Sequence, residues 1–419
     1  MISTCESRLR RLTKAKSVRL LIAVILVIVS QTIYAQTPRP AAPRVFLVDA
    51  RNLSETRRRV LAGDKTYTAA LRRLEADAQK ALDAGLFSVT SKEVTPPGGD
   101  KHDYMSQAPY FWRNPKTPDG LPYVRRDGER NPEINKITDH RNLDQMADSV
   151  ESLALAYYFR GEEAYASRAA QLLRAWFLDP ATRMNPNLQY AQYVPGVNTG
   201  RGIGLIETRG LTRVADSVGL LSGSKAWTES DQRGIVDWYS KFLQWMLESK
   251  NGKEENAAEN NHGTWFDVQA ASFALFTGKT DLAKSILETA KQKRIARQVE
   301  PDGREPLELT RTKSWDYSIF NLDALVTLAE LGEHVGVDLW HYQTADGRSI
   351  RRALEYLYPF AAGEKKWDYQ QLGGVEPQTL FPLMRRAALA YDDGKFRALM
   401  SNVPASDSAD RNRLLRARN

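Results

Sequence analysis

The feature that most constrains the fold is a long succession of helical patterns with almost no strand-like alternation. Apolar residues recur at the three- and four-residue spacing of an amphipathic helix, and Gly, Pro or short polar turns separate the segments. The pattern predicts one broken helix or two consecutive helices over 55–84, then helices over 139–160, 163–178, 203–222, 229–249, 256–277, 280–297, 314–333, 348–361 and 378–392. We therefore expect an all-α fold of stacked helical hairpins, either a solenoid or a closed toroid. The absence of a fixed-period sequence repeat disfavours the regular solenoid.

The first 35 residues have the features of a secretory signal peptide. Six basic residues precede the apolar run LLIAVILVIV, and Ala35 is the expected cleavage point. The run is short for a membrane span, which needs about 20 residues, so cleavage is favoured over an anchor. We expect a periplasmic or secreted protein without stable membrane insertion, with an extended leader over 36–50, one toroid domain over 51–405 and a polar tail over 406–419.

Charge and cysteine content narrow the function further. The formal net charge of +8 falls by five to +3 without the signal peptide, which removes the main support for a nucleic-acid partner. Cys5, the sole cysteine, leaves with the signal, so thiol catalysis and disulfides are excluded. No HExxH, cysteine cluster or Asp-rich loop is present, and GRGIG at 200–204 lacks the strand that a dinucleotide site needs. We predict no metal and no cofactor.

Two stretches at predicted helix starts carry chemistry. In ENNHGTWFDVQAASF, Asn261 and His262 stand where an N-cap and a solvated first-turn residue are the ordinary explanation. In REPLELTRTKSWDYSIFN, the start of another helix lies between Arg311 and Tyr317. The ordinary structural explanation is that Arg311 pairs with a carboxylate and that Tyr317 packs in the core. Amide, imidazole, guanidinium and phenol together suit β-elimination beside a carboxylate. That reaction needs donors or a cation on the carboxylate, which Asn261 and Arg311 can supply, plus a base and an acid.

These stretches resemble a known family. NNHGTW followed by RTKSWDY is similar to motifs of the alginate-lyase superfamily. So are DYMSQAPYFWRNP at 103–115 and VNTGRGIGLIETRGL at 197–211, and along the chain the four motifs stand in the order expected for that superfamily. The spacing is most like polysaccharide lyase family 38, which is related to families 5 and 17. The resemblance implies a single (α/α) toroid, an incomplete barrel of helical hairpins, that cleaves a 4-linked uronate polymer and leaves unsaturated uronate ends. Family members of this kind work without metal.

The resemblance also implies roles for the four residues. Asn261 and Arg311 would neutralise the substrate carboxylate, and Tyr317 would protonate the leaving glycosidic oxygen. His262 would be the base for one C5 epimer. For the epimer whose proton lies on the same face as the leaving oxygen, Tyr317 would be both base and acid. That route requires a positive charge, for which Arg311 is the candidate, to lower the pKa of Tyr317 from its ordinary value of about 10.

Substrate contacts are predicted from three regions. The long segment 91–135 lacks periodicity and contains aromatics, which favours a functional loop whose rings stack on sugars, although a hydrophobic plug fits the same residues. Arg201 and Glu207 lie in the central motif, and charged helical residues are ordinarily solvated or paired. The full set of predicted substrate-binding residues is Tyr104, Gln107, Tyr110, Trp112, Arg201, Glu207, Trp265 and Arg304.

Three alternatives remain open. The partner is an acidic polysaccharide, either alginate or glucuronan, because a site that neutralises a carboxylate does not fix C5 stereochemistry. A toroid glycoside hydrolase would use two carboxylic acids instead, drawn from Asp267, Glu305, Glu308 and Asp316. A non-catalytic polysaccharide-binding protein follows if the four groups do not converge in space.

Overall fold

The computed structural model describes residues 42–391, 394–401 and 409–416, and the part from Pro43 onward forms one compact unit. The predicted signal peptide, its cleavage point and Cys5 lie outside the described residues. Among the helices within them, none is long and apolar enough to cross a membrane.

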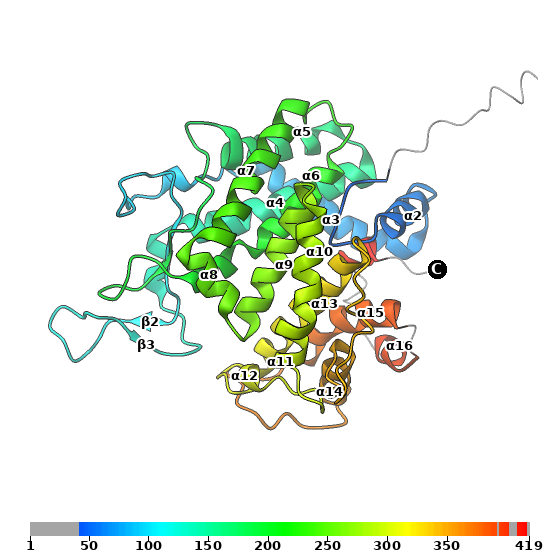
Figure 1. Ribbon diagram of the computed structural model, residues 1–419. Coiled ribbons are helices and arrows are strands. Elements are labelled where there is room, and N and C mark those ends of the chain that lie inside the picture. The colour runs from blue at the N-terminus through cyan, green and yellow to red at the C-terminus, as the bar shows by residue number, and fades with distance from the viewer. Residues whose placement is uncertain (1–41, 392–393, 402–408, 417–419) are drawn as a thin grey trace, which may run out of the picture. The chain divides into compact units, whose positions relative to one another are not determined.

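Helices dominate this unit, as the periodicity predicts (Figure 1). In chain order they are α2 (Ala50–Leu61), α3 (Thr68–Asp83), α4 (Asp139–Arg160), α5 (Glu163–Leu173), α6 (Leu211–Leu220), α7 (Glu229–Glu248), α8 (Lys250–Ala257), α9 (Asn261–Phe276), α10 (Thr280–Ala290), α11 (Ala296–Gln298), α12 (Pro306–Leu309), α13 (Ser314–Glu333), α14 (Ile350–Ala361), α15 (Phe381–Ala390), α16 (Gly394–Ser401) and α17 (Asn412–Leu415). A 3₁₀ helix, η5 (Gly202–Gly210), leads into α6. The predicted all-α fold is confirmed.

Most predicted boundaries agree with the structure, and the differences have local causes. The run over 55–84 forms two helices, and α2 begins early because the Asp49 carboxylate caps it by accepting two backbone N–H groups. The helix predicted over 256–277 is wrong at its start. The backbone of Ala258 is extended, with ψ of 135°, so that α8 ends before it and α9 begins at Asn261.

The helices pack as hairpins around an inner ring. Helices α4, α6, α9 and α13 follow one another through direct contacts, while α3, α5, α7 and α10 cover them from outside. Helix α9 is at the centre of the contacts, and every residue in it except His262 is buried. A helix that is apolar all round belongs in a core. This arrangement is the incomplete barrel of helical hairpins that the sequence predicts.

Both ends of the compact unit are tied to the inner helices. Near its start, the backbone N–H groups of Phe46 and Leu47 donate to the two carboxylate oxygens of Asp216 on α6, at 2.8 and 2.9 Å. Near its end, the Arg416 guanidinium contacts the Glu330 carboxylate on α13 at 3.0 Å. Each tie joins residues far apart in the sequence and therefore restrains the ring.

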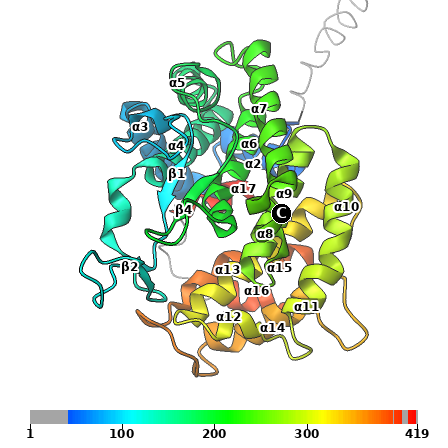
Figure 2. The ribbon, with the colours of Figure 1, turned by 60° about the vertical axis from the view of Figure 1, so that its left-hand side comes forward.

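Four short strands order part of the long segment over 91–135. Strand β1 (Met105–Gln107) pairs in parallel with β4 (Tyr190–Tyr193), and Figure 2 shows the two side by side. Strand β2 (Phe111–Trp112) pairs antiparallel with β3 (Val124–Arg125), which makes a hairpin. Tyr110, which directly precedes β2, reaches the N-terminal end of α13, where its hydroxyl lies 3.1 Å from that of Tyr317.

Candidate active site

Asn261 begins α9 and is fully buried. Its backbone N–H and its side-chain Nδ2 both donate to the Glu308 carboxylate on α12, each at 2.7 Å. The ordinary N-cap explanation is wrong here, because a carboxylate from another helix satisfies the first backbone donor of α9. Burial raises the pKa of Glu308, and the two bonds from Asn261 oppose that rise. The amide is thus held rigidly, and one of its two Nδ2 protons has no hydrogen-bond partner among the described residues.

His262 is the only residue of α9 that is not buried, and its imidazole is oriented by a buried carboxylate. Nδ1 lies 2.8 Å from Oε1 of Glu255 on α8, and the Glu255 side chain is 0 % exposed. Because a carboxylate accepts the proton of Nδ1, Nε2 is left with its lone pair toward the open side. The arrangement prepares His262 to act as a base. Glu255 is a functional residue that the sequence analysis missed.

The turn that holds His262 is fixed by a buried arginine. The Arg294 guanidinium donates to the Asp267 carboxylate at 2.7 Å and to the carbonyl of Ala258 at 2.7 Å. A Cβ on Gly263 would lie 2.1 Å from that carbonyl and 2.2 Å from Arg294 Nη1. Only glycine fits after the histidine, which explains the NNHG pattern by packing.

Tyr317 lies in the first turn of α13, with Arg311 against its ring. The Arg311 Cζ atom is 3.7 Å from the ring centroid, and the Tyr317 hydroxyl is 3.1 Å from the Tyr110 hydroxyl. Burial raises the pKa of Tyr317 and the bond to Tyr110 raises it further, while Arg311 acts in the opposite direction. Burial and the Tyr110 bond favour the neutral phenol, whereas the Tyr317-only route requires a lowered pKa. That route stays a prediction.

Arg311 is engaged by a carboxylate of the hairpin segment. Its Nη2 and Nε atoms donate to Asp127 at 2.9 and 3.2 Å, and the Thr312 hydroxyl donates to the same carboxylate at 3.2 Å. Although burial alone would raise it, the Arg311 guanidinium lowers the pKa of Asp127 to about 2. Arg311 consequently joins the loop to α13 while its positive charge stays beside Tyr317. The role of Asp127 was not predictable from the sequence, because its partner Arg311 is 184 residues away.

The four predicted catalytic residues therefore converge. Asn261 and Glu308 join the start of α9 to α12, and the short stretch from Glu308 to Arg311 leads to Tyr317 on α13. Helices α9 and α13 also pack against each other. Imidazole, amide, guanidinium and phenol thus stand at adjoining helix N-termini, where the helix dipoles add positive potential.

Comparison with known proteins places this site in a family. The family model described as alginate lyase matches residues 88–367, a span that contains the whole cluster. The chain belongs to the alginate lyase family. Membership identifies the protein as a polysaccharide lyase, an enzyme whose substrate is an acidic polysaccharide.

Solved structures agree with this alginate lyase assignment. The chain is similar to an alginate lyase from Bacteroides ovatus, with 37 % identity and a TM-score of 0.87 over 90 % of this chain and 100 % of that one. It shares the fold of alginate lyase A1-III from Sphingomonas species A1 at 17 % identity and a TM-score of 0.58, covering 92 % and 100 % of the two chains. An A1-III variant complexed with tetrasaccharide gives 16 % identity and a TM-score of 0.58, with coverage of 92 % and 99 %. The comparison with curated proteins gives no match.

In this alginate lyase family member, several of the predicted substrate-binding residues are buried. Tyr104 is fully buried and donates to Glu207, itself 3 % exposed, at 2.8 Å. Trp265 is buried, and its ring packs on Phe320 with centroids 5.1 Å apart. Tyr104, Glu207 and Trp265 have almost no exposed surface in this structure, and their contact with sugar stays a prediction. Arg304 is also not part of the cluster, since it is exposed and pairs with Asp302 at 2.7 Å.

The remaining predicted contacts lie around the cluster. Tyr110 reaches Tyr317 directly, as described above. Trp112 is partly exposed, donates to the carbonyl of Glu129 at 3.0 Å and has the Arg126 guanidinium over its ring. Gln107 is buried, and its Nε2 atom has no hydrogen-bond partner among the described residues. Arg201 is partly buried, and its Nη2 atom donates to Gln192 Oε1 at 2.8 Å.

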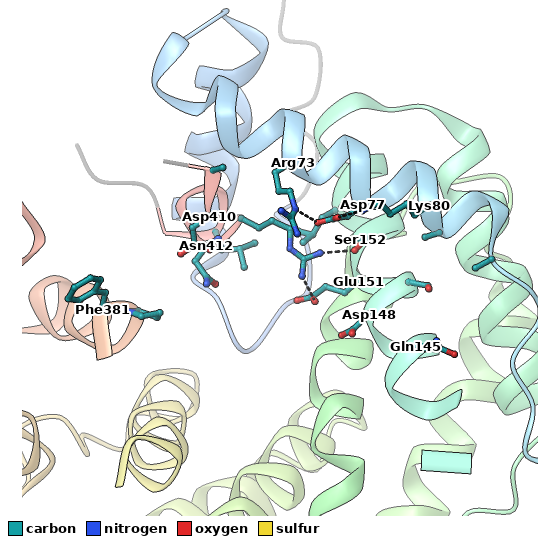
Figure 3. Close-up of a pocket in the computed structure, with 18 of the residues that line it drawn as sticks. Arg73, Asp77, Lys80, Gln145, Asp148, Glu151, Ser152, Phe381, Asp410 and Asn412 are labelled. Atoms are coloured by element: carbon teal, nitrogen blue, oxygen red, sulfur yellow. Dashed lines mark hydrogen bonds and ion pairs between the residues drawn. The ribbon is translucent and has the colours of Figure 1, made fainter. Parts of the chain in front are cut away.

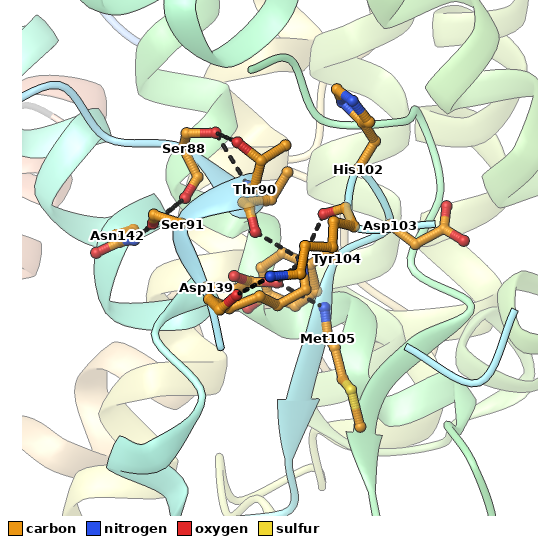
Figure 4. Close-up of polar contacts among 12 residues, drawn as sticks. Ser88, Thr90, Ser91, His102, Asp103, Tyr104, Met105, Asp139 and Asn142 are labelled. Atoms are coloured by element: carbon orange, nitrogen blue, oxygen red, sulfur yellow. Dashed lines mark hydrogen bonds and ion pairs between the residues drawn. The ribbon is translucent and has the colours of Figure 1, made fainter. Parts of the chain in front are cut away.

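A buried ion pair anchors the loop that carries these residues. Lys92 Nζ lies 3.0 Å from Asp139 Oδ2, both side chains are 0 % exposed, and the same carboxylate accepts the backbone N–H of Met105 at 2.9 Å (Figure 4). Burial lowers the pKa of Lys92 and raises the pKa of Asp139 to about 6, and the partner's charge opposes each shift. The pair fixes β1 on the first turn of α4.

A cavity of about 1090 Å³ lies elsewhere, between α3, α4 and the segment that carries α17, and Figure 3 shows Asp77, Glu151 and Asp410 on its walls. No predicted catalytic residue lines it. Across the described residues there is also no group of three or more His, Cys, Asp or Glu side chains placed to hold a metal.

Proposed function

We propose that this polysaccharide lyase cleaves alginate by β-elimination, with Asn261, His262, Arg311 and Tyr317 as its catalytic residues. The observation that carries the proposal is the cluster itself, in which the Glu255 carboxylate orients an imidazole and the Arg311 guanidinium lies against the Tyr317 ring. The similarity to an alginate lyase at 37 % identity over 90 % of the chain supports alginate as the polymer.

Each group has a role that its surroundings support. Nε2 of His262 removes the C5 proton of the uronate, and the Glu255 carboxylate stabilises the imidazolium that forms. The negative charge that develops on the substrate carboxylate is stabilised by an Asn261 N–H, by the Arg311 charge and by the α9 N-terminus. The Tyr317 hydroxyl gives its proton to the glycosidic oxygen as the C4–O bond breaks. The products are an unsaturated uronate end and a new hydroxyl end.

The surroundings of the acidic residues speak against a hydrolase. A glycoside hydrolase needs one carboxylic acid and one carboxylate facing the same bond. Asp267 is buried and forms an ion pair with Arg294, and the Glu308 carboxylate accepts hydrogen bonds from Asn261. Glu305 is fully enclosed and accepts from Asn321 at 2.9 Å. Only Asp316 among the four candidates is exposed, and one carboxylate does not make the pair.

The proposal extends to where the enzyme works. An enzyme that acts on a large extracellular polymer must meet it outside the cytoplasm, and the sequence of the first 35 residues supports export. We propose a periplasmic or secreted enzyme.

The test is growth of ultraviolet absorbance from unsaturated uronate ends on polymannuronate, polyguluronate and glucuronan. We expect a rise on at least one of the alginate polymers, loss of the signal in Tyr317→Phe, and little change in Tyr165→Phe, a matched substitution on α5 outside the site. A rise on glucuronan alone would replace the substrate and keep the chemistry. Reducing ends without absorbance would refute elimination.

A further inference from the structure

Arg201 is a largely buried guanidinium with no carboxylate within ion-pair distance in the described part of the chain, although the charges of Glu207, Glu254 and Glu255 act on it from farther away. Its Nη2 donates to the neutral Oε1 of Gln192 at 2.8 Å, and its Cζ lies 5.0 Å from the centroid of the Phe111 ring. Its Nε atom is buried without a hydrogen-bond partner, and Arg201 forms no ion pair within the described residues. Burial lowers the pKa of Arg201 to about 10, so the folded protein holds this charge at a cost. An anion bound here would remove that cost.

Buried contacts fix the backbone around Arg201 and its partner Gln192. Gln192 has a positive φ of 48°, which is strained for a residue other than glycine. Its backbone N–H donates to Ser106 Oγ at 2.8 Å, and this bond helps to hold the strained backbone. Ser106 Oγ donates in turn to the buried Glu207 carboxylate at 2.6 Å. A Cβ on Gly200 would lie 2.0 Å from the carbonyl of Gln189. Backbone and side chains thus hold the Gln192 amide against Arg201.

Two independent connections place Arg201 beside the catalytic cluster. On one side, Phe111 beneath it follows Tyr110, whose hydroxyl contacts Tyr317. On the other side, the chain neighbour of Arg201 donates its backbone N–H to Glu254 at 3.3 Å, and the next residue, Glu255, holds His262. Arg201 therefore lies close to both proton-transfer groups without belonging to them.

We propose that Arg201 forms an anion subsite for the carboxylate of the uronate that adjoins the reacting one. The inference rests on the proposed function, because it needs a polymer with a carboxylate on consecutive sugars. A guanidinium held by an aromatic ring and an amide keeps its planar fork fixed, which favours a carboxylate over a neutral sugar. The enzyme would then bind two successive uronates, one at the catalytic cluster and one at Arg201.

The experiment compares Arg201→Gln and Arg201→Lys with Arg233→Gln, a control at an exposed position on α7. Steady-state kinetics use the polymer that the unaltered enzyme cleaves best. Calorimetry measures binding of a mannuronate tetrasaccharide and a guluronate tetrasaccharide to each variant in a Tyr317→Phe background, where turnover is blocked. We expect Arg201→Gln to raise KM and Kd about 10- to 100-fold, the range for one charge-assisted pair, with kcat changed less than about threefold. Arg201→Lys keeps the charge and should lie between.

Each outcome is decisive. KM and Kd equal to those of the Arg233→Gln control would overturn the subsite while leaving the lyase activity intact, as would a fall in kcat at unchanged KM. If no variant cleaves any uronate polymer, the proposed function fails. The tetrasaccharide binding then still tests the subsite, which stands only if the loss is confined to the Arg201 variants. Should Arg201→Gln not fold, a rise in KM for Arg201→Lys supports the subsite and an unchanged KM refutes it.

Discussion

Replacing Glu255 by glutamine tests whether the buried carboxylate activates His262. The two side chains have nearly the same shape, so the change removes a charge at a fully buried position 2.8 Å from Nδ1 and little else. Glutamine can still accept the Nδ1 proton through its carbonyl oxygen, which keeps the imidazole in place. The variant therefore separates charge stabilisation of the imidazolium from simple positioning.

The magnitude follows from the charged hydrogen bond. A bond to an ionised group contributes about 1.5–3 kcal/mol, and each 1.4 kcal/mol lost from the transition state lowers the rate about tenfold. Because the full charge of the imidazolium exists only after proton transfer, the loss belongs to kcat and leaves KM largely unchanged. We expect Glu255→Gln to lower kcat about 10- to 100-fold on the polymer whose C5 proton His262 removes.

The assay is the initial rate of absorbance growth on polymannuronate and polyguluronate in parallel. His262 is predicted to be the base for only one C5 epimer, and cleavage of the other polymer needs another base, so the loss should be much larger on one polymer. In a His262→Ala background, Glu255→Gln should have no further effect, since its partner is gone. An equal loss on both polymers, or an additive effect in the double variant, would show that Glu255 supports the fold of α8 and does not activate the histidine.

Three further predictions concern stability, each measured by denaturant unfolding. Lys92→Met leaves Asp139 buried without its partner and should cost about 3–5 kcal/mol, whereas adding Asp139→Asn should restore part of the loss; a double variant less stable than the single one contradicts this. Burial raises the pKa of Asp216 to about 7, above its unfolded value of about 3.9, so its contribution is complete below about pH 4 and is lost as the pH rises to about 7. Asp216→Asn should therefore lose less stability than the unaltered protein over that window, and a larger loss refutes the assignment. Gly263→Ala should cost about 1–3 kcal/mol through overpacking, while Gly85→Ala, with no atom near its added Cβ, should be neutral.

The fold was predictable because helical periodicity is local. Helix α4 runs over Asp139–Arg160 and α13 over Ser314–Glu333, the ranges that the apolar spacing indicates. The gap before α9 was not predictable. Its cause is the buried Arg294, which binds the carbonyl of Ala258 from 36 residues away, and no local pattern reports such a contact.

The site was predictable to the extent that its chemistry stands in the sequence. Asn261, His262, Arg311 and Tyr317 are visible because their groups suit one reaction and their motifs resemble a family. The supporting carboxylates were not predictable. Nothing in the sequence singles out Glu255, and Glu308 stands there only as a candidate hydrolase acid, because its bond to Asn261 depends on the fold. The burial of the Tyr104 ring and the hydrogen bond from its hydroxyl to Glu207 likewise depend on contacts far apart in the sequence.

The distribution of charge around the catalytic cluster gives the proposed subsite a physical basis that net charge does not. Net charge acts over long distances and is screened by salt, whereas a buried guanidinium acts locally and is screened little. The Arg311 charge is shared with Asp127, so its attraction for a distant anion is largely cancelled while its effect on the Tyr317 ring remains. Arg201, in contrast, has no carboxylate within ion-pair distance in the described part of the chain. Selectivity for a carboxylate beside the reacting sugar therefore depends on this one residue more than on the total charge.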